Sequence, residues 1–375
     1  MVFDPHYVVM GTVETAQGPL TAWKSSSIKD PLWDTFLEST PRGHFEQTSM
    51  WAQVKLLEGW KPLRVVIIEG KSLRGGFQIL TRSKSYIGKV GLIMKGPVIA
   101  SDDPAVIRFI ISSLKKIAKS NKIRAIILQP PDKHTALSLL LRRDGFSNNY
   151  LENSIQSATI IIDLQKDENE LLKCMKPRKR YNIKHGLRTG VSFREGNKND
   201  LSTFFSFMLE TCKRQGVRPN PSNEKALTTM WELFSPNGNI KLFIAEYCKE
   251  AVSAQIVVPF GNCANLWKFG WSGKYGNCHP NEVLYWENFK WARSQGYSYA
   301  DLGAISSQVA NAVLQGTPLD EGTEKTWSAF KWGFGGEVTP LAEGCVYIYN
   351  PFLRLAYSLF MPFINSMPAL KRKLL

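Results

Sequence analysis

The sequence predicts an α/β fold, and three observations support this prediction. Segments in which apolar residues recur at helical spacing alternate with short runs rich in β-branched residues. A polar stretch at 146–157, FSNNYLENSIQS, interrupts this alternation, which then starts over. A chain of 375 residues is long enough for two domains, or for one large α/β unit. We place a joint in the polar stretch and expect one domain over 1–150 and a second over 151–343.

The first half carries clear signals for both kinds of element. Trp33, Phe36 and Leu37 have helical spacing, and Pro104 follows two aspartates that suit the start of a helix. The predicted helices of this half are 28–39, 49–58, 104–120 and 135–143. The predicted strands are 63–69, 76–81, 90–99 and 123–129.

The second half repeats this kind of pattern. Its predicted helices lie near 167–188, 199–215, 223–234 and 281–295. Its predicted strands lie near 159–164, 240–247, 251–259, 264–270 and 299–302. Residues 304–323 are polar and lack periodicity, which predicts an unusually long loop of the kind that is functional or disordered. Residues 350–375 are predicted to be helical, with a basic end at Lys371, Arg372 and Lys373.

The composition excludes several classes of protein. Hydrophobic residues make up 43% of the chain, which excludes global disorder. The net charge of +15 favours a polyanionic partner, such as nucleic acid, an anionic membrane surface or a phosphorylated substrate. The six cysteines lie at least 15 residues apart and the five histidines are scattered, so we expect reduced thiols and no metal site. Without a signal peptide or an apolar run of 18 residues, we expect a cytoplasmic protein with no spanning helix.

The strongest charge feature is the segment 171–193, which is rich in Lys and Arg and contains no acidic residue. If the part after Pro177 is helical, Arg180, Lys184 and Arg188 share one face. Like charges at this spacing repel, so they suit a face that binds phosphates. The alternative is a solvated basic face.

Two aromatic segments are further candidates. In 324–337, EKTWSAFKWGFGGE, Lys331 lies among aromatic residues, where an ammonium could stabilise developing negative charge. The alternative is an amphipathic turn whose lysine extends to solvent. In 265–272, NLWKFGWS, strand alternation puts Trp267, Phe269 and Trp271 on one side, where they either stack on a base or peptide or belong to the core.

An ordered set of segments resembles the FemABX family of peptidoglycan interpeptide-bridge enzymes, which are aminoacyltransferases built from two GNAT-like domains. The matching segments are FEQTSMWAQVK (45–55), GPVI (96–99), PRKRYNIKHGLRTGVSFREG (177–196), LWKFGWSG (266–273), the run from NEVLYW to YADLGA (281–304), and FKWGFGGEV (330–338). The long helical arm of some members is absent, because 196–240 has room for only two ordinary helices. The resemblance implies two GNAT-like acyltransferase domains with mixed sheets flanked by helices, and a C-terminal segment, 344–375, that packs back on the first.

The resemblance also implies roles for particular residues. The segment with Trp51 and Lys55 is similar to one whose lysine binds substrate phosphate in the family. Arg180, with Arg178 and Lys184 near it, matches a segment that contributes an arginine to the same phosphates. Lys331 matches a lysine important for transfer. Asp301 follows a strand and is either a general base or a turn residue.

The implied function is transfer of an amino acid from aminoacyl-tRNA to the stem-peptide amine of a lipid-linked or uridine-diphosphate-linked peptidoglycan precursor, without a cofactor. One alternative is an acyl-CoA-dependent GNAT N-acyltransferase of cell-surface polysaccharide synthesis, although 270–280 lacks the glycine-rich loop that binds the pyrophosphate of coenzyme A. A second is a non-catalytic RNA- or membrane-binding protein. Apolar residues between Phe352 and Phe363 either lie on the inner leaflet of the plasma membrane, as a peripheral contact, or pack against the first domain.

Overall fold

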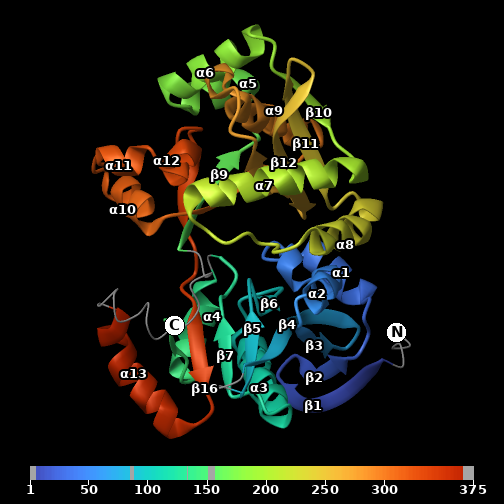
Figure 1. Cartoon of the computed structure of the whole chain (residues 1–375). Helices are drawn as coiled ribbons and strands as arrows, with labels where there is room; N and C mark the ends of the chain where they lie inside the picture. Colours follow the sequence, from blue (N-terminus) through green and yellow to red (C-terminus); the bar gives the residue numbers. More distant parts are fainter. Residues whose placement is uncertain (1–5, 85–87, 133, 151–156, 366–375) are drawn as a thin grey trace. The chain divides into compact units, whose positions relative to one another are not determined.

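The computed structural model describes residues 6–84, 88–132, 134–150 and 157–365. The chain divides into two compact units (Figure 1). Unit 1 contains Met1–Ile155 together with Leu341–Leu375, and unit 2 contains Gln156–Pro340. Half of the joint expected at 146–157, residues 151–156, lies outside the described residues.

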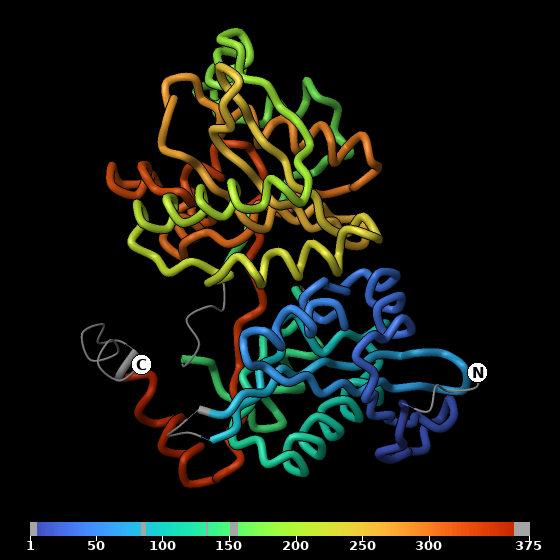
Figure 2. Tube along the Cα trace, turned by 45° about the vertical axis from the view of Figure 1, so that its right-hand side comes forward, coloured from blue at the N-terminus to red at the C-terminus, as the bar shows by residue number. Residues whose placement is uncertain are grey.

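Unit 1 is built on a nine-stranded mixed sheet. Its strands along the sheet are β1 (Tyr7–Thr15), β2 (Gly18–Ser25), β3 (Lys61–Glu69), β4 (Ser72–Lys84), β5 (Gly88–Ile93), β7 (Ala125–Leu128), β16 (Cys345–Ile348) and β8 (Ser147–Asn148), with β6 (Val98–Ile99) on β4. Strands β5 and β7 are parallel, and the other neighbours are antiparallel. The chain therefore returns after unit 2 to insert β16 between β7 and β8, as the red segment in Figure 2 shows.

Helices cover this sheet. They are α1 (Pro31–Ser39), α2 (Ser49–Leu56), α3 (Pro104–Ser120), α4 (Thr135–Arg143) and α13 (Pro351–Asn365), with a short 3-10 turn at Phe45–Gln47. Helix α3 begins at Pro104, and the Asp103 carboxylate accepts a hydrogen bond from the Ala105 amide, as the sequence predicts. Its apolar face, including Ile107, Ile110 and Leu114, is buried against β2, β3 and β4.

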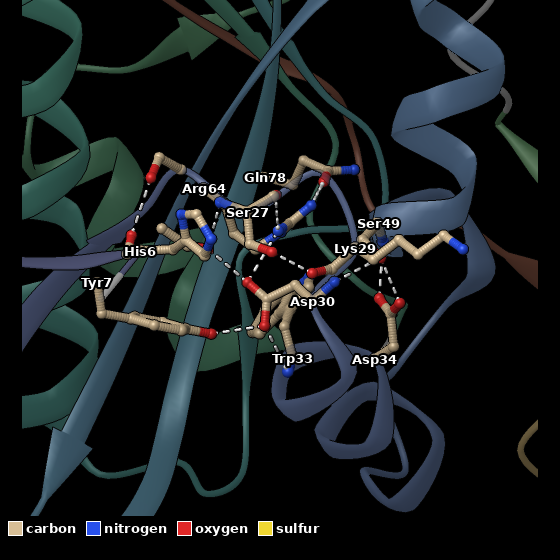
Figure 3. Close-up of polar contacts among 12 residues, drawn as sticks. His6, Tyr7, Ser27, Lys29, Asp30, Trp33, Asp34, Ser49, Arg64 and Gln78 are labelled. Atoms are coloured by element: carbon tan, nitrogen blue, oxygen red, sulfur yellow. Dashed lines mark hydrogen bonds and ion pairs between the residues drawn. The ribbon is translucent and has the colours of Figure 1, made fainter. Parts of the chain in front are cut away.

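A buried polar network joins α1 to the sheet (Figure 3). The Arg64 guanidinium donates 2.8 Å to the Asp30 carboxylate, and both side chains are 2% exposed. Tyr7 and Ser25 donate to the same carboxylate at 2.5 and 2.6 Å, and Arg64 also donates 2.7 Å to the Gln78 side-chain oxygen. Burial raises the pKa of Asp30, but the Arg64 charge and these hydrogen bonds outweigh it and leave the pKa below its usual value.

Unit 2 contains a seven-stranded sheet. Its order is β10 (Ser192–Glu195), β11 (Lys241–Tyr247), β12 (Glu250–Phe260), β13 (Cys263–Trp271), β14 (Tyr299–Ile305), β9 (Ala158–Asp163) and β15 (Glu337–Pro340). Its helices are α5 (Glu168–Cys174), α6 (Pro177–Arg188), α7 (Leu201–Gln215), α8 (Glu224–Phe234), α9 (Pro280–Ser294), α10 (Ser307–Gln315), α11 (Glu321–Glu324) and α12 (Trp327–Trp332).

Helices α9 and α7 cover opposite faces of this sheet (Figure 1). The α9 residues Val283 and Phe289 share a core with Leu266 of β13. On the other face α7 passes so close to β13 that a Cβ on Gly270 would lie 2.6 Å from the Met208 backbone nitrogen. Glycine is therefore needed at position 270 for this helix to pack on the strand.

Two predictions about the elements are wrong. Residues 304–323 are not a loop, because the Ser306 hydroxyl caps α10 and Gly316, with φ of 67°, ends it. The strand predicted over 90–99 is broken into β5 and β6 at Lys95, which has φ of 54°. The hairpin of β1 and β2 and the strand β16, which is only four residues long, were not predicted.

Candidate functional site

Unit 2 contains a pocket of about 640 Å³ between the starts of α6 and α9 and the segment around α11 and α12. Its lining residues are Lys176, Arg178, Lys179, Asn182, Gly276, His279, Glu282, Leu319, Glu321, Glu324, Lys325, Thr326, Ala329, Phe330 and Gly333. The wall therefore combines cations, carboxylates and one aromatic ring, which suits a ligand that carries both charged groups and apolar surface.

Lys179 and Glu282 form the buried wall of this pocket. The Lys179 ammonium donates 3.0 Å to the Glu282 carboxylate, which also accepts 3.0 Å from the Asn182 side-chain amide. The same ammonium lies 3.3 Å from the centre of the Phe330 ring. Burial lowers the pKa of Lys179 to about 8, although Glu282 opposes the shift. This pair holds α6 on α9 and fixes the base of the pocket.

Two further cations stand at the start of α6. Pro177 is the first residue of the helix, so Lys176 and Arg178 lie at its positive end. The Lys176 ammonium lies 3.5 Å from the centre of the Trp332 ring, and burial lowers its pKa. Arg178 is exposed and has no ion pair or hydrogen bond with the described residues. Across the pocket Lys325 is already paired with Glu321, so Lys176 and Arg178 are the cations best placed for an anionic ligand.

The other predicted cations of α6 lie elsewhere. The helix itself is confirmed, but the Arg180 guanidinium donates to the Met175 and Lys173 carbonyl groups at the end of α5 rather than to the pocket. Lys184 and Arg188 are exposed on the outer side of α6. The face that is buried carries Lys179, Asn182, Ile183 and Gly186 instead. Phosphate binding was predicted for Arg178, Arg180 and Lys184, and of these only Arg178 lines the pocket. The roles of Arg180 and Lys184 stay predictions.

Lys331 lies on α12 but faces away from the pocket, toward β14. Its ammonium donates 2.9 Å to the Ala304 carbonyl, and only 8% of the residue is exposed. Burial lowers the pKa of Lys331 to about 8, with Asp301 opposing and Lys268 assisting the shift. The lysine therefore does not extend to solvent, which excludes the alternative that we stated for it.

The position of Lys331 is set by a break in the sheet. Strands β13 and β14 pair only over Cys263–Asn265 and Tyr299–Asp301, and the register of β14 with β9 shifts between Asp301 and Ala304. Within this shift Gly303 has φ of 72°, which favours glycine. A Cβ there would lie 3.7 Å from the Lys331 ammonium and 3.9 Å from the Leu266 carbonyl oxygen. Lys331 thus places a cation where β13 and β14 part, which is a site able to stabilise an anion.

Asp301 holds this irregular part of β14. Its carboxylate accepts 2.7 Å from the Gly303 amide and also accepts the Thr159 hydroxyl of β9. These hydrogen bonds stabilise the shift in register between the two strands. They support the turn role for Asp301 over that of a general base.

The aromatic residues of β13 do not share one face. The register with β12 shifts so that Ile256 pairs with Lys268 and Val257 with Leu266, which leaves Trp267 in a bulge. Phe269 stacks on Trp327 at 4.6 Å and belongs to the edge of the core. The Trp271 indole donates 3.0 Å to the Lys274 carbonyl. The prediction of a common aromatic face over Trp267, Phe269 and Trp271 is therefore wrong.

Lys55 and Trp51 lie on α2 in unit 1. The Lys55 ammonium donates 2.8 Å to the Glu58 carboxylate and lies 4.8 Å from the Trp51 ring centre. Trp51 is 5% exposed and meets Phe45 edge-on at 5.5 Å. Lys55 would have to leave Glu58 in order to bind a phosphate, so its predicted role stays a prediction.

Sequence reasoning missed the residues that build the pocket, namely Lys176, Lys179 and Glu282. Their signal was present, because Pro177 marks a helix start and Lys179, Ile183 and Gly186 recur at helical spacing. The four-residue repeat of Arg180, Lys184 and Arg188 suggested a phosphate-binding face, but it marks the side of α6 away from the pocket. Glu282 carried no signal of its own, since its partner is 103 residues away in the sequence.

Two sequence profiles match the chain, one in each unit. The FemAB family matches residues 28–140, and the acetyltransferase (GNAT) domain matches residues 176–309. Lipid II:glycine glycyltransferase from Staphylococcus aureus strain MRSA252 is 26% identical over 223 residues, which cover 57% of this chain and 52% of that relative. The chain is therefore similar to the FemAB family in unit 1 and to GNAT acetyltransferases in unit 2. It spans about half the length of the curated relatives that it matches.

Solved structures are similar to this chain at the level of the fold. The crystal structure of FemX has a TM-score of 0.76 and 18% identity, and the match covers 94% of this chain and 100% of that one. A tandem GNAT protein from the clavulanic acid biosynthesis pathway has a TM-score of 0.50 and 9% identity, with coverage of 85% and 93%. The predicted α/β fold of two GNAT-like domains, with mixed sheets flanked by helices, is confirmed.

Proposed function

We propose that this protein is an aminoacyltransferase that moves an amino acid from aminoacyl-tRNA to the stem-peptide amine of a lipid-linked or uridine-diphosphate-linked peptidoglycan precursor. The match of unit 1 to the FemAB family and the similarity to lipid II:glycine glycyltransferase support the reaction and its acceptor. The observation that carries the proposal is the unit 2 pocket, in which Lys176 and Arg178 form no ion pair with a carboxylate of the described residues. The pocket lies beside α12, the helix that carries Lys331.

The pocket supports binding of the acceptor. The diphosphate of a peptidoglycan precursor carries negative oxygens, and a guanidinium at a helix start binds such oxygens with charge-assisted hydrogen bonds. The stem peptide offers apolar surface, for which Phe330 stands on the opposite wall. In this proposal Lys176 and Arg178 hold the phosphates and Phe330 contacts the stem peptide, whose amine end extends past the pocket toward Lys331 on the other side of α12.

The chemistry requires little beyond alignment and stabilisation of charge. The neutral amine attacks the ester carbonyl of the aminoacyl-tRNA, so that a C–N bond forms and the carbonyl oxygen becomes an oxyanion. The tetrahedral intermediate then breaks its C–O bond, the terminal hydroxyl of the tRNA leaves, and the proton lost by the amine balances the one taken up by that hydroxyl. The protonated Lys331 stabilises the oxyanion, because it is a fixed cation in a site with little water.

The choice of donor depends on the segment before α9. The segment before α9, residues 272–279, lacks the glycine-rich pattern that binds the pyrophosphate of coenzyme A, and α9 starts at Pro280 with no side-chain cap. This favours tRNA over acyl-CoA as the donor. Incubating the full chain with the precursor and either charged tRNA or labelled acetyl-CoA tests the choice: we expect an amide product with tRNA alone. A product with acetyl-CoA alone would support the polysaccharide N-acyltransferase alternative instead.

Replacing Arg178 is expected to weaken acceptor binding. We expect Arg178→Ala to raise the KM for the soluble uridine-diphosphate-linked precursor by about tenfold or more with kcat little changed, because one charge-assisted hydrogen bond is lost in both the ground and transition states. Steady-state kinetics measures both constants. Arg188→Ala, at the exposed end of the same helix, is the matched control and should behave as the wild type. Equal KM values for the two variants would count against the pocket as the acceptor site.

A further inference from the structure

Helix α13 of unit 1 presents an apolar stripe to solvent. Phe352, Leu355 and Leu359 recur at intervals of three and four residues, so they lie on one side of the helix, and they are 82%, 60% and 64% exposed. An exposed leucine is unremarkable by itself, but a contiguous row of large apolar side chains marks an interaction surface.

The opposite side of α13 fixes the helix to unit 1. Tyr357 is 7% exposed, and its hydroxyl donates 3.1 Å to the Asn148 carbonyl and accepts 2.7 Å from the Tyr150 amide. The Arg354 guanidinium lies 4.8 Å from the centre of the Tyr347 ring on β16. Because these contacts hold the helix by its other face, the apolar stripe is left exposed to solvent.

Cationic side chains lie beside the apolar stripe of α13. Between α13, β16 and the end of α3 lies a groove of about 1260 Å³, and none of the described residues that line it is acidic. Lys119, Lys122 and Arg124 on its rim are exposed and have no ion pair or hydrogen bond to a carboxylate among the described residues. Leu353 and Phe360 of α13 line the same groove, so apolar and cationic groups meet along one edge of the unit.

We propose that α13 lies in the surface of an anionic lipid bilayer, with Phe352, Leu355 and Leu359 among the acyl chains and the lysines at the end of α3 on the phosphate headgroups. The apolar face of the helix suits the acyl chains, and the cations that border it suit the anionic headgroups. In the described part of the chain no helix has the length and apolar character needed to span a membrane. The 15 residues of α13 would extend about 22 Å, less than the hydrocarbon core of about 30 Å. The helix therefore lies along the surface.

A second copy of the chain is a poorer occupant of this face. Two copies joined through the stripes would bring the Lys119, Lys122 and Arg124 edges of both molecules toward each other, and the chain carries a net charge of +15. Like charges at an interface disfavour association, whereas lipid phosphates neutralise them. The inference does not require the proposed transferase activity, because bilayer binding needs only unit 1 surface groups.

Flotation of the full chain with vesicles tests the proposal. We expect binding to vesicles of phosphatidylglycerol and phosphatidylcholine, at least about tenfold weaker binding to pure phosphatidylcholine, and weakening by added salt. Leu355→Glu/Leu359→Glu should lose at least about tenfold in affinity, and Lys119→Glu/Lys122→Glu should lose a similar factor for anionic vesicles only. Leu139→Glu, another exposed leucine of unit 1, and Lys71→Glu are the matched controls and should bind as the wild type.

The outcomes separate this inference from the proposed function. Transfer to the soluble uridine-diphosphate-linked precursor should be unchanged in Leu355→Glu/Leu359→Glu, while its vesicle binding is lost. Absence of binding to anionic vesicles, or equal binding by this variant and Leu139→Glu, would overturn the proposal. A concentration-dependent dimer that the same variant abolishes, in analytical ultracentrifugation without lipid, would also overturn it in favour of a second copy.

Discussion

Lys331→Met is expected to reduce kcat for aminoacyl transfer by about 10²- to 10³-fold, the usual loss when one donor to an oxyanion is removed. The KM for the acceptor should change little, because Lys331 lies outside the lining of the pocket that holds Lys176 and Arg178. Rate measurements at saturating acceptor and charged tRNA give kcat directly. Lys198→Met, an exposed lysine paired with Glu232 on the same unit, is the control and should retain full activity.

The pH dependence of the rate should identify Lys331 more specifically. Because burial lowers its pKa to about 8, the ammonium is present at neutral pH and is lost as the pH rises through 8. We therefore expect the wild-type rate to fall above about pH 8. Deprotonation of the attacking amine would by itself have the opposite effect and raise the rate. The residual activity of Lys331→Met should lack this falling limb. A falling limb of equal pKa in the variant would assign it to another group.

Stability gives a readout of Lys331 that is independent of activity. Its folded pKa lies below the usual lysine value of about 10.4, so between these values the unfolded chain binds more protons and stability rises with pH. At pH 7 the buried charge costs on the order of 3 kcal/mol, while removing the lysine leaves the Ala304 carbonyl without its donor at a cost of about 1–3 kcal/mol. We expect Lys331→Met to be at least as stable as the wild type at pH 7, although its kcat for transfer is strongly reduced.

Arg64→Met is expected to lower the free energy of unfolding by about 3–5 kcal/mol, because it leaves the Asp30 carboxylate buried without its counter-ion. Thermal and urea unfolding followed by circular dichroism measure the change. The deficit should shrink as the pH falls below about 4, since protonation of Asp30 removes the stability that its lowered pKa contributes above that value. Arg143→Met, an exposed arginine on α4, should stay within about 0.5 kcal/mol of the wild type.

A double variant distinguishes the contribution of the Asp30–Arg64 ion pair to stability from that of side-chain packing. In Asp30→Asn/Arg64→Met no buried charge remains in the pair, so part of the stability lost in Arg64→Met should return. If the double variant is as unstable as the sum of the two single variants, the two side chains do not act as a pair. Because α1 and α2 rest on this network, the single variant should also loosen the segment that contains Trp51 and Lys55.

Most helices and strands could be predicted from local signals in the sequence. Pro104 after Asp103, Pro177 at the start of α6 and the β-branched runs of β3 and β7 specify their elements within a few residues of the chain. The α10 helix was mistaken for a loop, because only Val309 and Ala310 of this short helix are buried, which leaves little periodicity to detect.

The site was harder to predict, because its side chains depend on tertiary contacts. Lys331 was selected from its aromatic neighbours, but its placement depends on the register shift of β14 and on Gly303, which no spacing in the sequence indicates. Lys179 was passed over for the same reason: a lysine whose partner is Glu282 of α9 looks like any other cation in a basic run. Burial and long-range pairing distinguish these lysines, and both properties arise only when the chain folds.

The central claim is that the unit 2 pocket holds the phosphates of the acceptor, and a crystal structure of the full chain with the soluble uridine-diphosphate-linked precursor tests it most directly. We expect the diphosphate within hydrogen-bonding distance of Lys176 and Arg178, with the stem peptide along Phe330. A diphosphate bound only to residues outside the lining of this pocket would show that the acceptor binds elsewhere.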